Sequence, residues 1–324
     1  MKIEQVRELT HSFLPGTRLE SLTLELIEKG GSGRMFFRVS DPDSGRSWVA
    51  MAYSDDRPDN ARFASITDFL INHHVAVPAI LGRKEEIGYL LVQDLGSIDL
   101  GNYVGEDWAT VQRPGYEKAL ETVFALHQIT ENLQPDDLPE LEFCFDADLY
   151  QWEQDYFFNH YVANFEPLES SSLQSDPIFA KIRDELSELP RALVHRDFQS
   201  TNVMFQNDNC YLIDYQGMRF GLPEYDVASM IYDPYVDLTE GQRNELIAYY
   251  FQLKQKAGHP ESLVEFEKRL NICAIQRLMQ ALGAYGFLGK EKGKTEFFQY
   301  IAPAKERLRY VATEECDVLS RILA

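Results

Sequence analysis

The sequence predicts an α+β protein of two lobes, a small antiparallel sheet lobe followed by a larger and mainly helical one. Three observations support this prediction. Five short apolar or alternating runs, separated by turn residues, crowd into the first 95 residues together with one amphipathic helix. The remainder, 96–324, follows the 3.6-residue apolar period of helices almost throughout. Only the region 193–214 interrupts that period with short β-branched runs.

The elements of the first lobe are expected in a simple order. A short helix over about residues 1–14 precedes strands at 23–27, 34–39 and 47–53. A helix then begins at Pro58, where proline suits a first turn, and ends near His73 before a Val-Pro pair. Strands at 80–81 and 89–92 complete a five-stranded antiparallel sheet. Gly96 permits a bend after the last strand, so we place the domains at 1–95 and 96–324.

The second lobe is expected to be a set of helices around a short strand region. Three apolar runs, at 192–194, 202–205 and 211–214, surround the turn Asn207-Asp208-Asn209 and predict strands. Residues 166–175, with three serines in a row, are expected to form a loop. Amphipathic or apolar periodicity predicts helices at 113–132, 146–164, 176–188, 224–232, 240–257, 260–288 and 295–321.

Charge and composition exclude several classes of protein. A hydrophobic content of 44% indicates a globular fold, while the net charge of -21 makes nucleic acid and anionic membranes poor partners. The four cysteines are scattered without metal-site spacing, so we expect reduced, buried thiols. No apolar stretch has the length of a signal peptide core or a membrane span. We therefore expect a soluble, cytoplasmic monomer.

One eight-residue segment carries the strongest chemical signal. Residues 195–202, His-Arg-Asp-Phe-Gln-Ser-Thr-Asn, fit the kinase catalytic-loop pattern H-R-D-x-x-x-x-N, and Asp214 ends a later apolar run. A loop that carries one acid, joined through a hairpin to a strand that ends in another, is expected to bring the two carboxylates close together. We expect Asp197 to accept the proton of an acceptor hydroxyl. Asn202 and Asp214 offer the hard oxygen ligands that Mg²⁺ prefers. The pattern predicts a phosphoryl-transfer site.

Residues that hold phosphates are less sharply indicated. The cluster Gly31-Ser32-Gly33 can cap phosphates with backbone amides or can be an ordinary hairpin. The strand at 47–53 has no lysine where kinases use one to hold the α- and β-phosphates. Arg34 and Arg38 lie on one face of the preceding strand and either face solvent or enter the cleft. Our hypothesis is that one of them supplies the missing positive charge.

Several polar residues near the motif are further candidates. Asp226 either caps a helix or braces the catalytic loop. His127 lies near the apolar stripe of its helix and is expected to be a satisfied core histidine. The candidates for contact with the acceptor, some of which are equally suited to packing, are Gln199, Gln216, Glu224, Asp233 and Tyr235.

The same residues resemble a known family. The segments 195–202, Ile-Asp-Tyr-Gln at 213–216 and Gly-Leu-Pro-Glu-Tyr-Asp-Val-Ala-Ser at 221–229 are similar to the aminoglycoside phosphotransferase and choline kinase superfamily. Within it, the likeness is greatest to bacterial anomeric kinases of N-acetylmuramate and N-acetylglucosamine, which serve peptidoglycan recycling. The resemblance implies a bilobal protein-kinase-like fold, with ATP and Mg²⁺ as cofactors. It also implies that adenine bonds to the backbone near Gln93, Asp94 and Leu95.

Three functions are compatible with these patterns. The leading hypothesis is an ATP-dependent kinase of a small molecule, acting on the anomeric hydroxyl of an N-acetylated amino sugar. A second keeps the chemistry and changes the acceptor to a cation, such as an aminoglycoside or choline. The third is a catalytically silent nucleotide-binding regulator. The missing lysine favours the third, and the presence of Asp197, Asn202 and Asp214 speaks against it.

Overall fold

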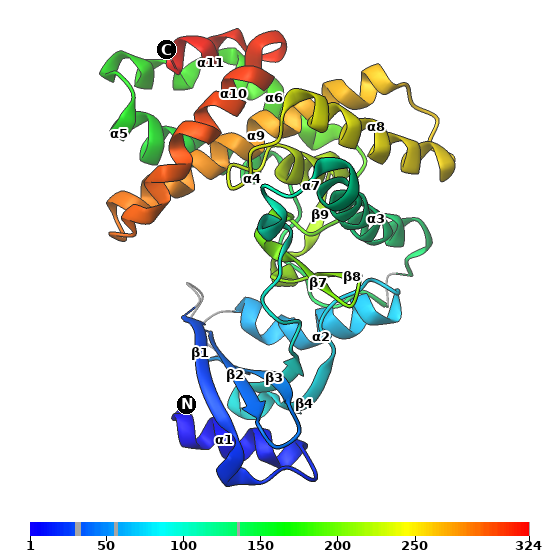
Figure 1. Ribbon diagram of the computed structural model, residues 1–324. Coiled ribbons are helices and arrows are strands. Elements are labelled where there is room, and N and C mark those ends of the chain that lie inside the picture. The colour runs from blue at the N-terminus through cyan, green and yellow to red at the C-terminus, as the bar shows by residue number, and fades with distance from the viewer. Residues whose placement is uncertain (30–33, 55–57, 135–136, 324) are drawn as a thin grey trace. The chain divides into compact units, whose positions relative to one another are not determined.

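The computed structural model describes residues 1–29, 34–54, 58–134 and 137–323 (Figure 1). The chain forms two compact units. The first comprises Met1–Ile98, Leu133–Glu142 and Met204–Gly217, and the second comprises Asp99–Asn132, Phe143–Val203 and Met218–Ala324. The predicted α+β, bilobal architecture is confirmed, with an antiparallel sheet in the first unit and mostly helices in the second.

The sheet of the first unit has five strands in the order β1-β2-β3-β5-β4. Each neighbouring pair is antiparallel. Alternate side chains such as Phe37, Val39 and Ala50 form a buried core on one face, where helix α1 (Ile3–Phe13) packs. Thr10 of α1 shares a 2.7 Å hydrogen bond with the hydroxyl of Tyr89. The strands are β1 (Thr23–Lys29), β2 (Met35–Asp41), β3 (Arg46–Ala52), β4 (Ile80–Lys84) and β5 (Tyr89–Gln93).

A later hairpin belongs to the first unit although the sequence places it far downstream. Strands β7 (Val203–Gln206) and β8 (Asn209–Leu212) pair, and Asn207 and Asp208 between them have φ of 50° and 63°. Asparagine and aspartate tolerate that left-handed backbone, which a tight two-residue turn requires. Backbone bonds from Phe205 to Ile98 and from Leu212 to Ala76 attach the hairpin. Helix α2 (Pro58–Asn72) packs against the segment that follows β8.

The second unit is organised around the long helix α9 (Leu263–Lys290), which packs against α4, α7 and α10 (Figure 1). A capping box of Ser262 and Glu265 starts α9. Two short strands of this unit, β6 (Ala192–Val194) and β9 (Arg219–Gly221), pair antiparallel. The other α-helices are α3 (Arg113–Gln128), α4 (Ala147–Phe157), α5 (Ala163–Phe165), α6 (Pro177–Glu188), α7 (Pro223–Ile231), α8 (Glu240–Lys256), α10 (Ile301–Glu315) and α11 (Asp317–Ile322).

Several predicted elements differ in detail. The helix expected over 113–132 is α3 followed by a 3₁₀ helix at Ile129–Asn132. The helix expected over 146–164 is α4, a π-helical turn at Phe158–Val162 and the short α5. The helix expected over 295–321 is a 3₁₀ helix at Thr295–Tyr300, then α10 and α11, which separate at Cys316, whose φ of -153° and ψ of 77° are not helical. The loop expected over 166–175 is mostly a 3₁₀ helix, Leu168–Ser175. Apolar periodicity does not distinguish α, π and 3₁₀ turns, which differ by one hydrogen-bond step.

The π-helical turn lies directly against α9. A Cβ atom at Gly286 would be 2.1 Å from the carbonyl oxygen of His160. Only glycine permits so close an approach between backbones. Gly286 therefore fixes where α9 docks. Across the described residues, each helix is too short or too polar to cross a bilayer.

Candidate functional site

The predicted catalytic loop leaves strand β6 in the second unit and is held by the first turns of α7. Asp226 accepts hydrogen bonds from the backbone amides of His195, at 2.6 Å, and Arg196, at 2.8 Å. Arg196 has a φ of 78°, a backbone conformation that costs a non-glycine residue energy and persists only when its surroundings fix it. Of the two alternatives for Asp226, the structure supports the loop brace. The N-cap of α7 is Leu222.

A buried chain of polar groups supports that brace. His127 of α3 lies between Asp226 and Tyr250 of α8, with Nε2 at 3.0 Å from the carboxylate and Nδ1 at 2.7 Å from the hydroxyl. Both ring nitrogens are therefore satisfied within the core. This confirms His127 as a satisfied core histidine, and it extends the brace from α7 to α3 and α8.

The far end of the loop is held in the same way. Asp233, just beyond α7, accepts from the backbone amide of Ser200 at 2.8 Å and from its hydroxyl at 2.6 Å. It also accepts from the amide of Tyr235 at 2.9 Å. Burial raises the pKa of Asp233, and the hydrogen bonds from Ser200 oppose that rise. The two candidates Asp233 and Tyr235 thus lie beside the loop, with the carboxylate of Asp233 used to position it.

Asp197 lies between two guanidinium groups. Arg196 contacts its Oδ2 through Nη1, and Nη2 of Arg277 lies 3.7 Å from its Oδ1. Burial alone would raise the pKa of Asp197, but the two arginines outweigh burial and hold it below its ordinary value. The carboxylate is therefore ionised at neutral pH. Asn202 donates from Nδ2 to the Asp197 backbone carbonyl at 2.9 Å, which directs the amide oxygen of Asn202 away from that carbonyl.

Arg277 is a site residue that sequence reasoning missed. It lies on α9, where it donates from Nε to the Ser229 hydroxyl at 3.0 Å and from Nη1 to Gln280. Its Nη2 is 3.4 Å from the side-chain oxygen of the candidate Gln199. One signal was present in the sequence. Gln276, Arg277 and Gln280 interrupt the apolar run of α9, and all three are buried.

Asp214 lies in the first unit, two residues beyond strand β8. Its Oδ1 accepts from Nε2 of Gln216 at 2.7 Å and lies 3.6 Å from Nη2 of Arg34. The carboxylate is 48% exposed, whereas the Arg34 side chain is 6% exposed. Arg34 is thus buried against the second acid of the predicted site. Tyr215 anchors the segment to α2, with its hydroxyl 2.8 Å from that of Thr67.

Arg38 is committed elsewhere in the first unit. It donates to both carboxylate oxygens of Asp94, at 2.8 and 3.2 Å, and to the carbonyl of Gly96 at 2.8 Å. Burial raises the pKa of Asp94, but hydrogen bonds from Arg38 and Ser47 bring it below its ordinary value. These contacts fix the backbone just after β5, where adenine was expected.

The rest of the segment where adenine binding is predicted, Gln93 to Leu95, is also fixed by hydrogen bonds and burial. Gln206 of β7 accepts from the Gln93 side chain at 2.9 Å and donates to the Asp94 carbonyl at 2.7 Å. Leu95 is buried. The candidates Gly31, Ser32 and Gly33 lie outside the described residues.

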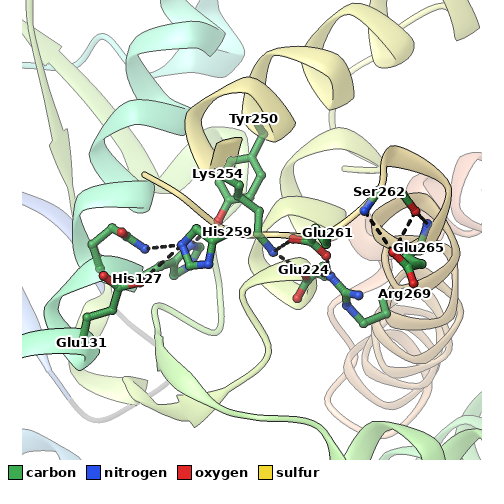
Figure 2. Close-up of polar contacts among 11 residues, drawn as sticks. His127, Glu131, Glu224, Tyr250, Lys254, His259, Glu261, Ser262, Glu265 and Arg269 are labelled. Carbon is green, nitrogen blue, oxygen red and sulfur yellow. Dashed lines mark hydrogen bonds and ion pairs between the residues drawn. The ribbon is translucent and has the colours of Figure 1, made fainter. Parts of the chain in front are cut away.

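Glu224 belongs to a different cluster of the second unit (Figure 2). Its Oε1 is 2.9 Å from Lys254 and 3.1 Å from Arg269, and both cations also contact Glu261. Burial raises the pKa of Glu224, but Lys254 and Arg269 lower it below its ordinary value. The cluster lines a cavity of ≈ 430 Å³ that also includes His127 and Tyr250. In the described part of the chain, the carboxylate of Glu224 therefore pairs with Lys254 and Arg269, and its predicted contact with the acceptor stays a prediction.

The sequence is similar to those of known phosphotransferases. The model of the phosphotransferase enzyme family matches residues 23–263. An N-acetylmuramate/N-acetylglucosamine kinase of Pseudomonas aeruginosa is 26% identical over 295 residues, which cover 87% of this chain and 80% of that protein. A protein of the same name from Neisseria meningitidis is 25% identical over 291 residues, which cover 88% of this chain and 84% of that one.

Solved structures of kinases share the fold. A choline kinase from Cryptosporidium parvum superposes with a TM-score of 0.62 at 15% identity and covers 100% of both chains. An amicoumacin kinase solved with AMP-PNP and Ca²⁺ gives a TM-score of 0.63 at 13% identity, covering 97% of this chain and 95% of that one. Such distant likenesses establish the architecture.

Proposed function

Because the chain belongs to the phosphotransferase enzyme family, whose acceptors are hydroxyl groups, we propose that it transfers the γ-phosphoryl group of ATP to an amino sugar. The acceptor is N-acetylmuramate or N-acetylglucosamine, as the names of its curated relatives suggest, and we take the anomeric hydroxyl as the one that is modified. The observation that carries the proposal is the ionised Asp197 on a loop braced at both ends. We propose that this activity takes place in the cytoplasm.

Asp197 acts on the acceptor hydroxyl. Its carboxylate orients the hydroxyl in line with the phosphorus and accepts the proton late in the transfer. A carboxylate with a lowered pKa is a weak base, which suits a loose transition state in which the nucleophile keeps its proton until the bond to phosphorus forms. Orientation is therefore the larger part of its contribution.

We assign Asn202 and Asp214 as the ligands of a magnesium ion because of the oxygen atoms that each one offers. The amide nitrogen of Asn202 is used by the Asp197 carbonyl, so its amide oxygen suits a hard cation. Asp214 is half exposed and turned by a left-handed backbone with φ of 63°. Bound there, Mg²⁺ would neutralise the polyphosphate. Arg34, buried beside Asp214, takes the part of the absent third-strand lysine, because Arg38 is held by Asp94.

One experiment separates the candidate functions. ATP consumption is measured with N-acetylmuramate, N-acetylglucosamine, an aminoglycoside and choline as acceptors, and phosphorus NMR identifies the hydroxyl that is modified. We expect turnover of the N-acetylated sugars with phosphate on the anomeric oxygen. Turnover of only the cationic acceptors would contradict the proposed substrate, and ATP binding without turnover would favour a regulator.

A further inference from the structure

We propose that Arg277 recognises a carboxylate on the acceptor, so that the enzyme prefers an anionic N-acetylated amino sugar to its neutral counterpart. N-acetylmuramate carries a lactyl carboxylate that N-acetylglucosamine lacks, so the two sugars differ in the required way. The inference rests on the proposed function, because it takes Asp197 as the residue that meets the acceptor hydroxyl.

The position of Arg277 suits this task. Its Nη2 atom lies 3.7 Å from Oδ1 of Asp197, and its side chain is 11% exposed. A group on the acceptor a few ångströms from the reacting hydroxyl would therefore meet the guanidinium in a site with little water. Charge-assisted hydrogen bonds gain strength when water is excluded.

The bonds of Arg277 orient it and leave one side weakly used. Nε is fixed by Ser229 at 3.0 Å and Nη1 by Gln280, both within the second unit. The contacts of Nη2, 3.4 Å to Gln199 and 3.7 Å to Asp197, are longer than good N–H···O bonds of about 2.7–3.2 Å. The planar guanidinium is thus held in place, and its Nη2 group can donate to an acceptor that lies closer.

The ion pair of Arg277 with Asp197 is long, at 3.7 Å. Among the described residues, its hydrogen-bond partners Ser229, Gln280 and Gln199 are neutral. Asp197 already has Arg196 as a direct partner. Burial raises the pKa of the carboxylates Glu153 and Asp233, and the charge of Arg277 opposes that rise. The hydrogen bonds to Glu153 come from Tyr225 and Gln276. Those to Asp233 come from Ser200 and Tyr235. An incoming carboxylate would complete the pairing of a buried cation.

The surroundings also suit a sugar. Tyr235 and Tyr300 pack edge to face with ring centres 4.4 Å apart, and Tyr285 lies 5.7 Å from Tyr300. Burial raises the pKa of Tyr235 and of Tyr285, and the charge of Arg277 opposes that rise, so both rings lie within its electrostatic reach. Aromatic faces bind the apolar C–H faces of sugars, while a charged group provides orientation. The anionic subsite thus adjoins a surface for the pyranose.

The test compares the two sugars in three proteins. We measure kcat/KM for N-acetylmuramate and for N-acetylglucosamine at saturating ATP, in the wild type, Arg277→Gln and Arg277→Lys. Loss of a hydrogen bond to a charged group costs about 1.5–3 kcal/mol, so Arg277→Gln should reduce the preference for N-acetylmuramate roughly ten- to hundredfold. Arg277→Lys keeps the charge and should retain part of the preference. Arg309→Gln, the same charge change at an exposed position of α10, should leave the ratio unchanged.

The outcomes separate this inference from the proposed function. Equal losses for both sugars would overturn the inference and leave Arg277 as a residue that positions Asp197. A higher KM for ATP with an unchanged sugar ratio would overturn it in favour of a contact with the phosphates. If the wild type phosphorylates neither sugar, the proposed function itself fails. Thermal unfolding of each variant verifies that the compared proteins are folded.

Discussion

At the scale of single residues, the site depends on how charges are paired. Asp197 is flanked by Arg196 and Arg277, and Asp214 faces Arg34. Each acid of the predicted site thus has at least one guanidinium beside it in a chain whose net charge is -21. The arginines are local exceptions to the general charge of the protein.

Replacement of Asp197 by asparagine should remove the proton acceptor while keeping the shape of the side chain. We expect kcat to fall by about 10²–10⁴-fold, because the amide neither accepts the proton nor orients the hydroxyl through a charge-assisted hydrogen bond. The dissociation constant for ATP should change little, because nucleotide contacts are assigned to other residues. Turnover assays and calorimetric titration with ATP check the two halves of this expectation. A variant with wild-type kcat would contradict the role of Asp197.

Replacement of Arg34 by alanine should raise the KM for ATP by about tenfold or more, because a buried cation beside Asp214 would be lost. Arg38→Ala is the matched comparison, since Arg38 is occupied by Asp94 and Gly96. That variant should lower stability more than it changes KM. If the KM for ATP is unchanged in both variants, neither arginine replaces the missing lysine.

At the scale of elements, helix α7 and the residues just after it organise the catalytic loop. Asp226 near the start of the helix holds His195 and Arg196, and Asp233 beyond its end holds Ser200. The neighbouring Glu224 ties the same first turn to α8 and α9 through Lys254 and Arg269. The placement of the loop therefore depends on ion pairs that are not part of the reaction.

Glu224→Gln tests that dependence. At neutral pH the variant should unfold with roughly 1–3 kcal/mol less free energy, because Lys254 and Arg269 would lose one carboxylate partner and keep Glu261. The folded-state pKa of Glu224 lies below its ordinary 4.5, so its stabilising effect is present above that pH and is lost as the pH falls toward the lowered value. Urea unfolding of wild type and variant should therefore converge in acid. Glu8→Gln, at an exposed position of α1, should show no such convergence.

The sequence predicted this element only in part. The acids in its first turn were visible, and a brace by Asp226 was one of two alternatives. Which alternative holds depends on the position of residues 195 and 196, about thirty positions earlier, which local patterns do not contain. The polar residues Gln276, Arg277 and Gln280 within the apolar run of α9 could likewise be recognised in the sequence. Its meeting with Asp197 follows from tertiary packing, so Arg277 was missed.

At the scale of the whole molecule, the two-lobed α+β architecture was predicted from periodicity because strands and helices segregate along the chain. Hairpin β7–β8 is the exception. Its turn was recognisable from Asn207 and Asp208, but its membership of the first unit arises from backbone bonds to Ala76 and Ile98. Long-range bonds of this kind leave no mark on local sequence.

The acidic charge of the whole protein makes a separate prediction. A net charge of -21 repels ATP at long range, and salt screens that repulsion over a Debye length of about 10 Å at 0.1 M. With N-acetylglucosamine as the neutral acceptor, kcat/KM for ATP should therefore rise as ionic strength increases from low values. A steady fall with salt would show instead that local arginines dominate the encounter.

The close contact between Gly286 and the His160 carbonyl acts as a ruler along α9. Arg277 precedes this glycine by nine positions, which corresponds to about 13 Å along a helix. A single added methyl group at the docking point would have to slide or tilt the whole rod. The guanidinium of Arg277 would then no longer lie where it can bind the carboxylate of the acceptor, although no residue near it had changed. The preference between the two sugars would thus depend on the absence of a side chain at Gly286, more than two helical turns from Arg277.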